Sequence, residues 1–329
     1  MQEKVERLER TLLATNRSLK KFKKKSKDDL QKHREEMQEV MKKLLSNEKE
    51  KKDPILLVTI LPSILQTSHI SVPGIENICK ISLASPDKLW VSDGEEELLQ
   101  VDFKGHLRQR SVIQYSISHT ITGNGNLLFT CGENVKKFKS DGTITTLITS
   151  TENVECIHSS RINGDILVGI YCTIPHTETS IGKVIRYDKK GKKLLDIEQD
   201  NNGQQLFQVP YDITENKNGD IWTSDKCMAV VVDKSGDHRF NYTGLPSQSS
   251  FRPQRICTDV LGYVLVCDNF SSSIHLLSKE GRLLSILLPK QYNMRPPFAL
   301  CVDDKHNLYL GEYESNIITV FKYLEVTEQ

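Results

Sequence analysis

One short strand-like segment recurs six times in the chain and constrains its fold more than any other feature. The copies are LWVSD (89–93), LLFTC (127–131), ILVGI (166–170), IWTSD (221–225), VLVCD (264–268) and LYLGE (308–312). They begin 38, 39, 55, 43 and 44 residues apart. A repeat of about 40 residues built from strand-forming residues predicts an all-β fold, a β-propeller with six blades.

Further strands and turns recur around each copy. A second strand follows, and in five units it runs into a polar turn that ends in glycine, at Gly105, Gly142, Gly191, Gly236 and Gly281. Hairpin turns of this kind need a positive φ, which glycine adopts without strain. Three units also carry a proline before an apolar residue of the innermost strand, in VPYDI, RPQRI and PPFAL. Each unit is therefore expected to be a four-stranded blade.

The two ends of the repeat region are expected to pair. The sixth unit stops after its third strand, and the apolar run LLVTILP (56–62) precedes the first unit. We expect this run to supply the missing outer strand, because closing the ring removes unpaired sheet edges. The predicted domains are a helix over 1–50, a linker with the closing strand over 51–66, and the propeller over 67–329. Insertions in the third unit, 172–182 and 198–205, are expected to be surface loops.

The N-terminal arm has the composition of a long helix. Residues 3–50 contain no Gly and no Pro and are rich in Glu, Lys, Arg and Leu. Their apolar positions are three and four apart, with one change of register near Ser26 that is typical of a stutter. So narrow an apolar stripe needs a partner helix, which predicts self-association as a coiled-coil dimer. The predicted seam consists of Val5, Leu8, Leu12, Leu19, Phe22, Leu30, Met37, Val40 and Leu44.

Charge is unevenly distributed along the chain. Residues 1–53 contain 17 Lys/Arg and 11 Asp/Glu, which leaves a net charge of −5 for the rest of a chain whose total is +1. We interpret the lysine-rich run 20–27 as a solvated helix face, with a nucleic-acid or anionic-membrane patch as the alternative. The acidic balance of the propeller disfavours a general attraction to nucleic acid.

The remaining features favour a cytoplasmic protein without a cofactor or a metal. The first residues lack the apolar segment of a signal peptide, and the longest apolar run, 54–65, is too short to span a membrane. The eight cysteines form no C-x-x-C pair, so we interpret them as packing residues. Carboxylates that end the recurrent strand are interpreted as turn-stabilising groups: Asp93, Asp225, Asp268 and Glu312.

The segment VCDNFSSSIHLLSKEG (266–281) resembles an NHL repeat, with a strand, an Asp, a polar loop, a strand containing Ile, and a Gly. Serines 271–273 stand where the family usually has Asn and Arg. A coiled coil followed by a propeller of this NHL or TolB-like type resembles the C-terminal part of the TRIM-NHL proteins, especially the expanded molluscan set. Those proteins usually begin with a zinc-binding RING and B-boxes.

No cluster of Cys and His at RING spacing occurs in these 329 residues. Ubiquitin ligase activity is therefore not carried over to this polypeptide unless a RING lies upstream. The chain is interpreted as a shortened form or as a relative that lacks the RING. What the resemblance implies is the recognition of a protein target by the propeller, as the substrate-recognition part of a ubiquitin ligase system.

The target is expected on the face formed by the segments that lead into the inner strands and by the turns after the recurrent strands. Aromatic and arginine side chains dominate interface energetics. The candidates on this face are Tyr211, Phe251, Arg252, Arg255, Tyr292, Arg295, Phe298 and Tyr313. For Tyr211 and Phe298 the alternative is packing between blades.

Two other functions are alternatives. The same face could bind RNA, with Arg252, Arg255 and Arg295 as a local positive patch. A propeller hydrolase would need carboxylates and amides that converge on a metal from the inner strands. Those strands carry mostly Cys, Ile and Thr, and the chain has neither a Ser-His-Asp nor an H-E-x-x-H arrangement. The sequence therefore favours binding over catalysis.

Overall fold

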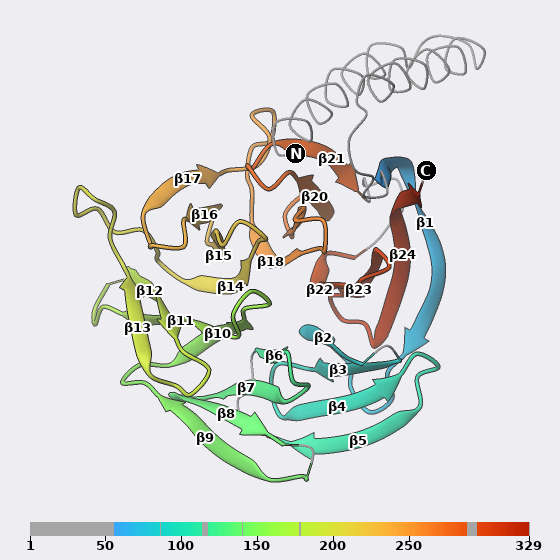
Figure 1. The fold of residues 1–329 in the computed structure, drawn as a ribbon, viewed down its shortest axis with the longest axis horizontal. Helices are drawn as coiled ribbons and strands as arrows, with labels where there is room; N and C mark the ends of the chain where they lie inside the picture. Colours follow the sequence, from blue (N-terminus) through green and yellow to red (C-terminus); the bar gives the residue numbers. More distant parts are fainter. Residues whose placement is uncertain are drawn as a thin grey trace, which may run out of the picture. The chain divides into compact units, whose positions relative to one another are not determined.

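All of the secondary structure in the computed structural model is β-strand, within residues 56–85, 87–113, 118–139, 141–177, 179–287 and 295–328, which the structure describes. Across these ranges, 24 strands form six four-stranded sheets that surround a common axis as the blades of a propeller (Figure 1). The same ranges hold no helix, so none that is long and apolar enough to cross a membrane. Over the described residues the fold prediction is therefore corrected to a six-bladed all-β propeller, in which no helical coiled coil is shown. The helix predicted over 1–50, with its seam from Val5 to Leu44, lies outside the described residues.

The first three blades follow one another along the chain, each with its strands in sequence order from the axis outward. Blade 1 contains β2 (Lys80–Ser85), β3 (Lys88–Ser92), β4 (Glu97–Asp102) and β5 (Leu107–Val112). Blade 2 contains β6 (His119–Ile121), β7 (Leu127–Cys131), β8 (Asn134–Phe138) and β9 (Ile144–Thr149). Blade 3 contains β10 (Val154–Ser159), β11 (Ile166–Thr173), β12 (Ser180–Tyr187) and β13 (Lys193–Ile197).

The last three blades repeat this arrangement, except that blade 6 takes its outer strand from the start of the repeat region. Blade 4 contains β14 (Pro210–Glu215), β15 (Ile221–Asp225), β16 (Met228–Val232) and β17 (His238–Tyr242). Blade 5 contains β18 (Pro253–Thr258), β19 (Val264–Asp268), β20 (Ser273–Leu277) and β21 (Leu283–Leu287). Blade 6 contains β22 (Pro297–Val302), β23 (Asn307–Glu312), β24 (Ile317–Glu328) and β1 (Leu56–Ser71).

The second strand of each blade is covered on both faces. Every residue of β15 and of β19 is buried, whereas the outer strand β5 has no buried residue. A strand that packs between two neighbouring sheets has no solvent face, so its sequence reads as a nearly continuous apolar run. This position explains why the second strand supplies the recurrent segment that is visible in the sequence.

One turn design recurs at the end of the propeller opposite the start of the inner strands. In blade 3 the carboxylate of Asp188 accepts the backbone N–H groups of Lys190 at 2.8 Å and Lys192 at 2.9 Å. Gly191 in this turn has a φ of 87°, and a Cβ there would lie 2.4 Å from the backbone oxygen of Leu147 in blade 2. Glycine therefore satisfies both the turn conformation and the close approach of the neighbouring blade.

The ring is closed by antiparallel pairing between β1 and β24. Val72 N–H donates to Asn316 O at 2.8 Å just beyond the strands, and the Thr67 hydroxyl donates to Val320 O at 3.1 Å. The strand that was predicted over 56–62 extends to Ser71, so residues assigned to the linker also belong to this strand. The closing strand therefore reaches the apolar layer between blade 6 and blade 1.

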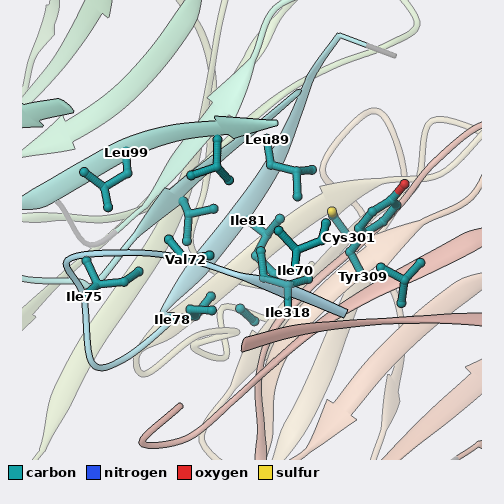
Figure 2. Close-up of a cluster of buried hydrophobic side chains, with 14 residues drawn as sticks. Ile70, Val72, Ile75, Ile78, Ile81, Leu89, Leu99, Cys301, Tyr309 and Ile318 are labelled. Atoms are coloured by element: carbon teal, nitrogen blue, oxygen red, sulfur yellow. The ribbon is translucent and has the colours of Figure 1, made fainter. Parts of the chain in front are cut away.

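That apolar layer combines residues from the two ends of the repeat region (Figure 2). Ile70 of β1, Ile318 of β24 and Leu89 of blade 1 are all buried in one cluster. The side chains of Ile70 and Ile318 lie beside each other in the close-up. Closure thus uses buried apolar area as well as the backbone pairing of the edge strands.

We expect Ile70→Ala to lower the free energy of unfolding by about 2–5 kcal/mol, because it leaves a cavity between the first and last blades. Ile70 is only 2% exposed, whereas Leu65 in the same strand is 60% exposed. The control Leu65→Ala should change stability by no more than about 0.5 kcal/mol. Urea unfolding of both variants measures the difference, and equal stabilities would contradict the role of β1 in closure.

Candidate functional site: the entry face and the charged axis

We call the end of the propeller at which the inner strands begin the entry face. It consists of the segments that lead into the inner strands and of the turns between the second and third strands. In blade 4 this segment is held by Asp225, the last residue of β15, whose carboxylate accepts the N–H groups of Gln208 at 2.6 Å and Val209 at 2.7 Å. A carboxylate that ends the recurrent strand thus fixes the chain just before the inner strand starts.

The same arrangement positions the entry face of blades 5 and 6. Asp268 is fully buried and accepts the N–H groups of Arg252 at 3.0 Å and Phe270 at 3.1 Å. Glu312 accepts the N–H of Arg295 at 3.2 Å. These contacts give the recurrent carboxylates a structural role, and they bring the backbones of Arg252 and Phe270 to one oxygen atom.

Phe251 and Arg255 are buried, although the sequence analysis placed both on the surface of the binding face. Phe251 is 3% exposed, because its ring packs edge-on against Tyr242 at 5.4 Å and beside His275 at 5.2 Å between ring centroids. Arg255 is 5% exposed. Its Nε donates to the backbone oxygen of Cys79 and its Nη1 to that of Tyr211, each at 3.0 Å. Arg255 therefore ties blade 5 to blades 1 and 4.

The remaining predicted residues lie on the entry face with different exposure. Tyr313 is 47% exposed, and its ring packs edge-on against the half-buried Phe298 at 5.6 Å. The exposed Arg295 donates to the backbone oxygens of Tyr313 and Glu314. Arg252 is exposed, and Tyr292 lies outside the described residues. The three arginines that were considered as an RNA-binding patch therefore do not form one set of free cations.

Sequence reasoning missed Phe270, which is 49% exposed in the turn between β19 and β20. Its neighbours are polar, in DNFSSS, so the loop has no hydrophobic pattern. Its position could have identified it, because Phe270 follows the strand-ending Asp268 by two residues. That turn lies on the predicted binding face. An exposed aromatic side chain at such a position is a candidate contact residue.

Four inner strands carry a β-bulge near their first residue. Single extra residues are Glu155 in β10, Tyr211 in β14 and Phe298 in β22, and β18 has the same irregularity between Pro253 and Ile256. Bulges re-aim side chains and often occur beside functional sites. Glu155, Tyr211 and Phe298 are all half-buried. In blades 4, 5 and 6 a proline precedes the bulge, and this proline is the only feature of the sequence that indicates the bulge.

A buried ion pair crosses the axis just below these bulges. Lys80 of blade 1 and Asp212 of blade 4 occupy corresponding register positions, opposite Ser92 and Ser224 of their own blades. The Lys80 Nζ lies 2.5 Å from the Asp212 Oδ1, and the two residues are 8% and 0% exposed. The order of the inner strands places blades 1 and 4 on opposite sides of the ring. This pair therefore links opposite sides of the propeller through its centre.

Two histidines beside this pair are held neutral. Burial lowers the pKa of His119 to about 3, and the positive charge of Lys80 acts in the same direction. Burial also lowers the pKa of His158 to about 3, with Lys80 as the next cause. His119 Nδ1 is 2.9 Å from the Ser82 hydroxyl, while the Nε2 atoms of both histidines are buried without a hydrogen-bond partner among the described residues. With their pKa values lowered this far, both rings are expected to be uncharged near neutral pH.

The charges at the axis bear on the hydrolase alternative. In the part of the chain that the structure describes, no three His, Cys, Asp or Glu side chains come together as a metal site would require. The Asp212 carboxylate at the axis is already paired with Lys80, and Arg255 adds a further cationic group nearby, so the charges disfavour a metal ion there. The arrangement is suited to holding blades together and to presenting side chains on the entry face.

No family model matches the chain, and no curated protein sequence matches it. Its fold is similar to that of solved propellers with low sequence identity. Virginiamycin B lyase from Staphylococcus aureus is 13% identical, with a TM-score of 0.56 over 82% of this chain and 99% of that one. A gluconolactonase from Xanthomonas campestris is 12% identical, with a TM-score of 0.56 over 85% and 99%. The WD40 propeller domain of Doa1 is 13% identical, with a TM-score of 0.53 over 79% and 97%. At these identities the likeness concerns the fold alone.

We expect Asp212→Asn and Lys80→Met each to destabilise the propeller by about 3–5 kcal/mol, because each leaves one buried charge without its partner. The double variant should lose much less than the sum of the two single variants. A double-mutant cycle from urea unfolding measures this coupling. Additive losses would show that the pair does not act as a unit.

Stability should fall as the pH drops from about 6.5 toward about 3. His119 and His158 stay neutral in the folded chain, whereas the unfolded chain takes up protons on both below their ordinary pKa. Each contributes a slope of up to about 1.4 kcal/mol per pH unit. His119→Asn should reduce the slope of the free energy of unfolding against pH. The same substitution at the exposed His69, His69→Asn, is the control. An unchanged slope in His119→Asn would contradict this account.

Proposed function

We propose that this propeller is a protein-interaction module that binds a protein target through its entry face. The observation that carries the proposal is a set of aromatic and arginine side chains held on two neighbouring blades. Phe270 and Arg252 are fixed by Asp268 in blade 5, and Arg295 is fixed by Glu312 in blade 6 beside Tyr313. These are the residue types that contribute most to protein interfaces.

The packing beneath these residues supports the proposal. Phe298 packs edge-on against the ring of Tyr313, and the guanidinium of Arg255 lies 5.8 Å from the Phe298 ring centroid. Arg255 is itself bonded to the backbones of two other blades. The exposed ring of Tyr313 therefore rests on a rigid base, which lowers the entropic cost of binding there.

A ubiquitin ligase system is the setting that the NHL-like repeats favour. In that setting the bound target is a substrate for ubiquitylation, and the propeller supplies recognition without catalysis. The axis supports a non-catalytic role, because its charged groups are engaged in links between blades. The RNA alternative receives less support, because Arg255 is buried and Arg295 is bound to backbone oxygens.

The proposal is tested with a photo-crosslinking amino acid placed at position 313 or 270 in cells that express the full chain. We expect both positions to crosslink the same protein target. The control is position 162, because Ile162 is 57% exposed in the turn between β10 and β11, at the opposite end of the propeller. Crosslinks to RNA, or equal crosslinking at 162, would contradict binding of a protein on the entry face.

Truncation of the exposed aromatics should weaken binding of that target. We expect the double variant Phe270→Ala and Tyr313→Ala to lower affinity by about tenfold or more, since exposed aromatic anchors each contribute more than about 1 kcal/mol at interfaces. Ile162→Ala is the matched apolar truncation and should leave affinity unchanged. The measurement is the dissociation constant of the crosslinked target, with the thermal stability of each variant as a check on folding.

A further inference from the structure

We propose that Glu155, together with Tyr171 and Tyr211, receives a cationic side chain of the partner, an arginine or a lysine. This inference rests on the proposed function and names the chemistry of the partner at one place on the entry face. The partner segment would present a basic residue to blades 3 and 4, while the exposed aromatics of blades 5 and 6 contact its apolar part.

Glu155 is placed for this role by the bulge in β10. Val154 pairs with Ile170 and Cys156 with Gly169, so Glu155 is the extra residue between them. Cys156 is fully buried, whereas Glu155 is half-buried at the entry end of the inner strand. Its carboxylate forms no hydrogen bond and no ion pair with any other residue that the structure describes. A carboxylate that is partly removed from water without a partner is a favourable site for a cation.

The two tyrosines come from neighbouring blades that meet at glycine residues. Tyr171 pairs with Gly182 across β11 and β12, and Tyr211 follows Pro210 at the start of β14. A Cβ at Gly182 would lie 2.8 Å from Pro210 Cδ, so blade 4 begins directly against the strand partner of Tyr171. The close approach of these backbones brings Tyr171 and Tyr211 to the same side of the axis as Glu155.

A second glycine completes the junction beside Glu155. A Cβ at Gly169 would lie 2.4 Å from Cys156 Sγ and 3.0 Å from Pro210 Cβ. Cys156 is the residue after Glu155, and Pro210 is the residue before Tyr211. Residues larger than glycine would separate the two bulges. The junction therefore holds the two bulge residues Glu155 and Tyr211 next to each other.

The electrostatics of the three groups agree with this geometry. Burial raises the pKa of the Tyr171 and Tyr211 hydroxyls, and the negative charge of Glu155 adds to both shifts. Burial also raises the pKa of Glu155, an effect that the positive charge of Arg255 only partly offsets. Neither tyrosine hydroxyl forms a hydrogen bond with another described residue. Tyrosine faces attract ammonium and guanidinium groups, so they add to the attraction of the carboxylate.

Arg255 does not satisfy Glu155. Its Nε and Nη1 atoms are bonded to the backbone oxygens of Cys79 and Tyr211, and no ion pair links it to Glu155. Glu152, three residues earlier in the same blade, differs because its carboxylate lies 3.6 Å from the Lys183 Nζ. The two glutamates thus form a matched pair for a test, one with a cationic partner and one without.

The test uses the full chain labelled with meta-fluorotyrosine and followed by fluorine NMR. The chain has ten tyrosines, and the variants Tyr171→Phe and Tyr211→Phe identify the two resonances of interest. N-acetyl-arginine amide is the cationic probe, with N-acetyl-glutamine amide and N-acetyl-glutamate amide as neutral and anionic probes. We expect the arginine amide alone to shift both resonances with saturation.

Glu155→Gln should weaken binding of the arginine amide by about tenfold or more, while Glu152→Gln should change it by less than about twofold. Both variants remove one negative charge from blade 3, so a general loss of acidic potential would affect them equally. Absence of a saturable shift, or equal affinity in Glu155→Gln and the unsubstituted chain, would overturn the inference. A preference for the glutamate amide would also overturn it and would assign an anion to this side of the axis.

These outcomes are separate from those that test the proposed function. If crosslinking at positions 270 and 313 identifies a protein target but the arginine amide does not bind, the inference about Glu155 fails and the binding face stands. If the arginine amide binds and no protein target crosslinks at those positions, the proposed function fails while the cation site stands.

Discussion

Closure of the ring is the constraint on which the rest of this structure depends. Each blade covers one face of the next, so an open ring would expose both the apolar face of blade 1 and the edge of β24. The pairing of β1 with β24 joins residues at the two ends of the repeat region, and Ile70 enters the apolar layer beside blade 1. Once the ring is closed, the six inner strands converge on one axis, and the register of each determines which side chains meet there.

The groups that repeat from blade to blade and those that differ have separate roles. The carboxylates Asp225, Asp268 and Glu312 do the same work in three blades, since each fixes the backbone that leads into the inner strand. The residues at the bulges differ among the four blades that have one, with Glu155 and Tyr211 as neighbours. A repeat that holds the backbone constant while one side chain varies provides a rigid frame for recognition, so specificity is expected at the bulges rather than at the carboxylates.

The sequence was sufficient for the blades, because strand chemistry and turn glycines recur at a regular interval. The coiled coil that was predicted from the N-terminal pattern has no counterpart in the described structure. Phe251 was assigned to the surface because its segment lies on the entry face, but its side chain turns inward against Tyr242. The pair of Lys80 and Asp212 is separated by 132 residues, so no local pattern could reveal it. The register between two strands can be predicted from the sequence where a turn and the apolar alternation define it. A bulge shifts the register and breaks the alternation, so it hides the pairing beyond it.

Charge at the axis links the stability of the ring to what its entry face can bind. Lys80 and Asp212 neutralise each other at the centre, and Arg255 satisfies two backbone oxygens above them. A buried ion pair contributes little net stability when compared with apolar packing, but it requires one register in both blades. The bulges of blades 3 and 4, which carry Glu155 and Tyr211, instead meet at the glycine junction, and the Glu155 carboxylate has no partner among the described residues. Because Lys80 is paired with Asp212 and Arg255 is bonded to backbone oxygens, neither cation forms an ion pair with Glu155, and its negative charge is left for a ligand to neutralise.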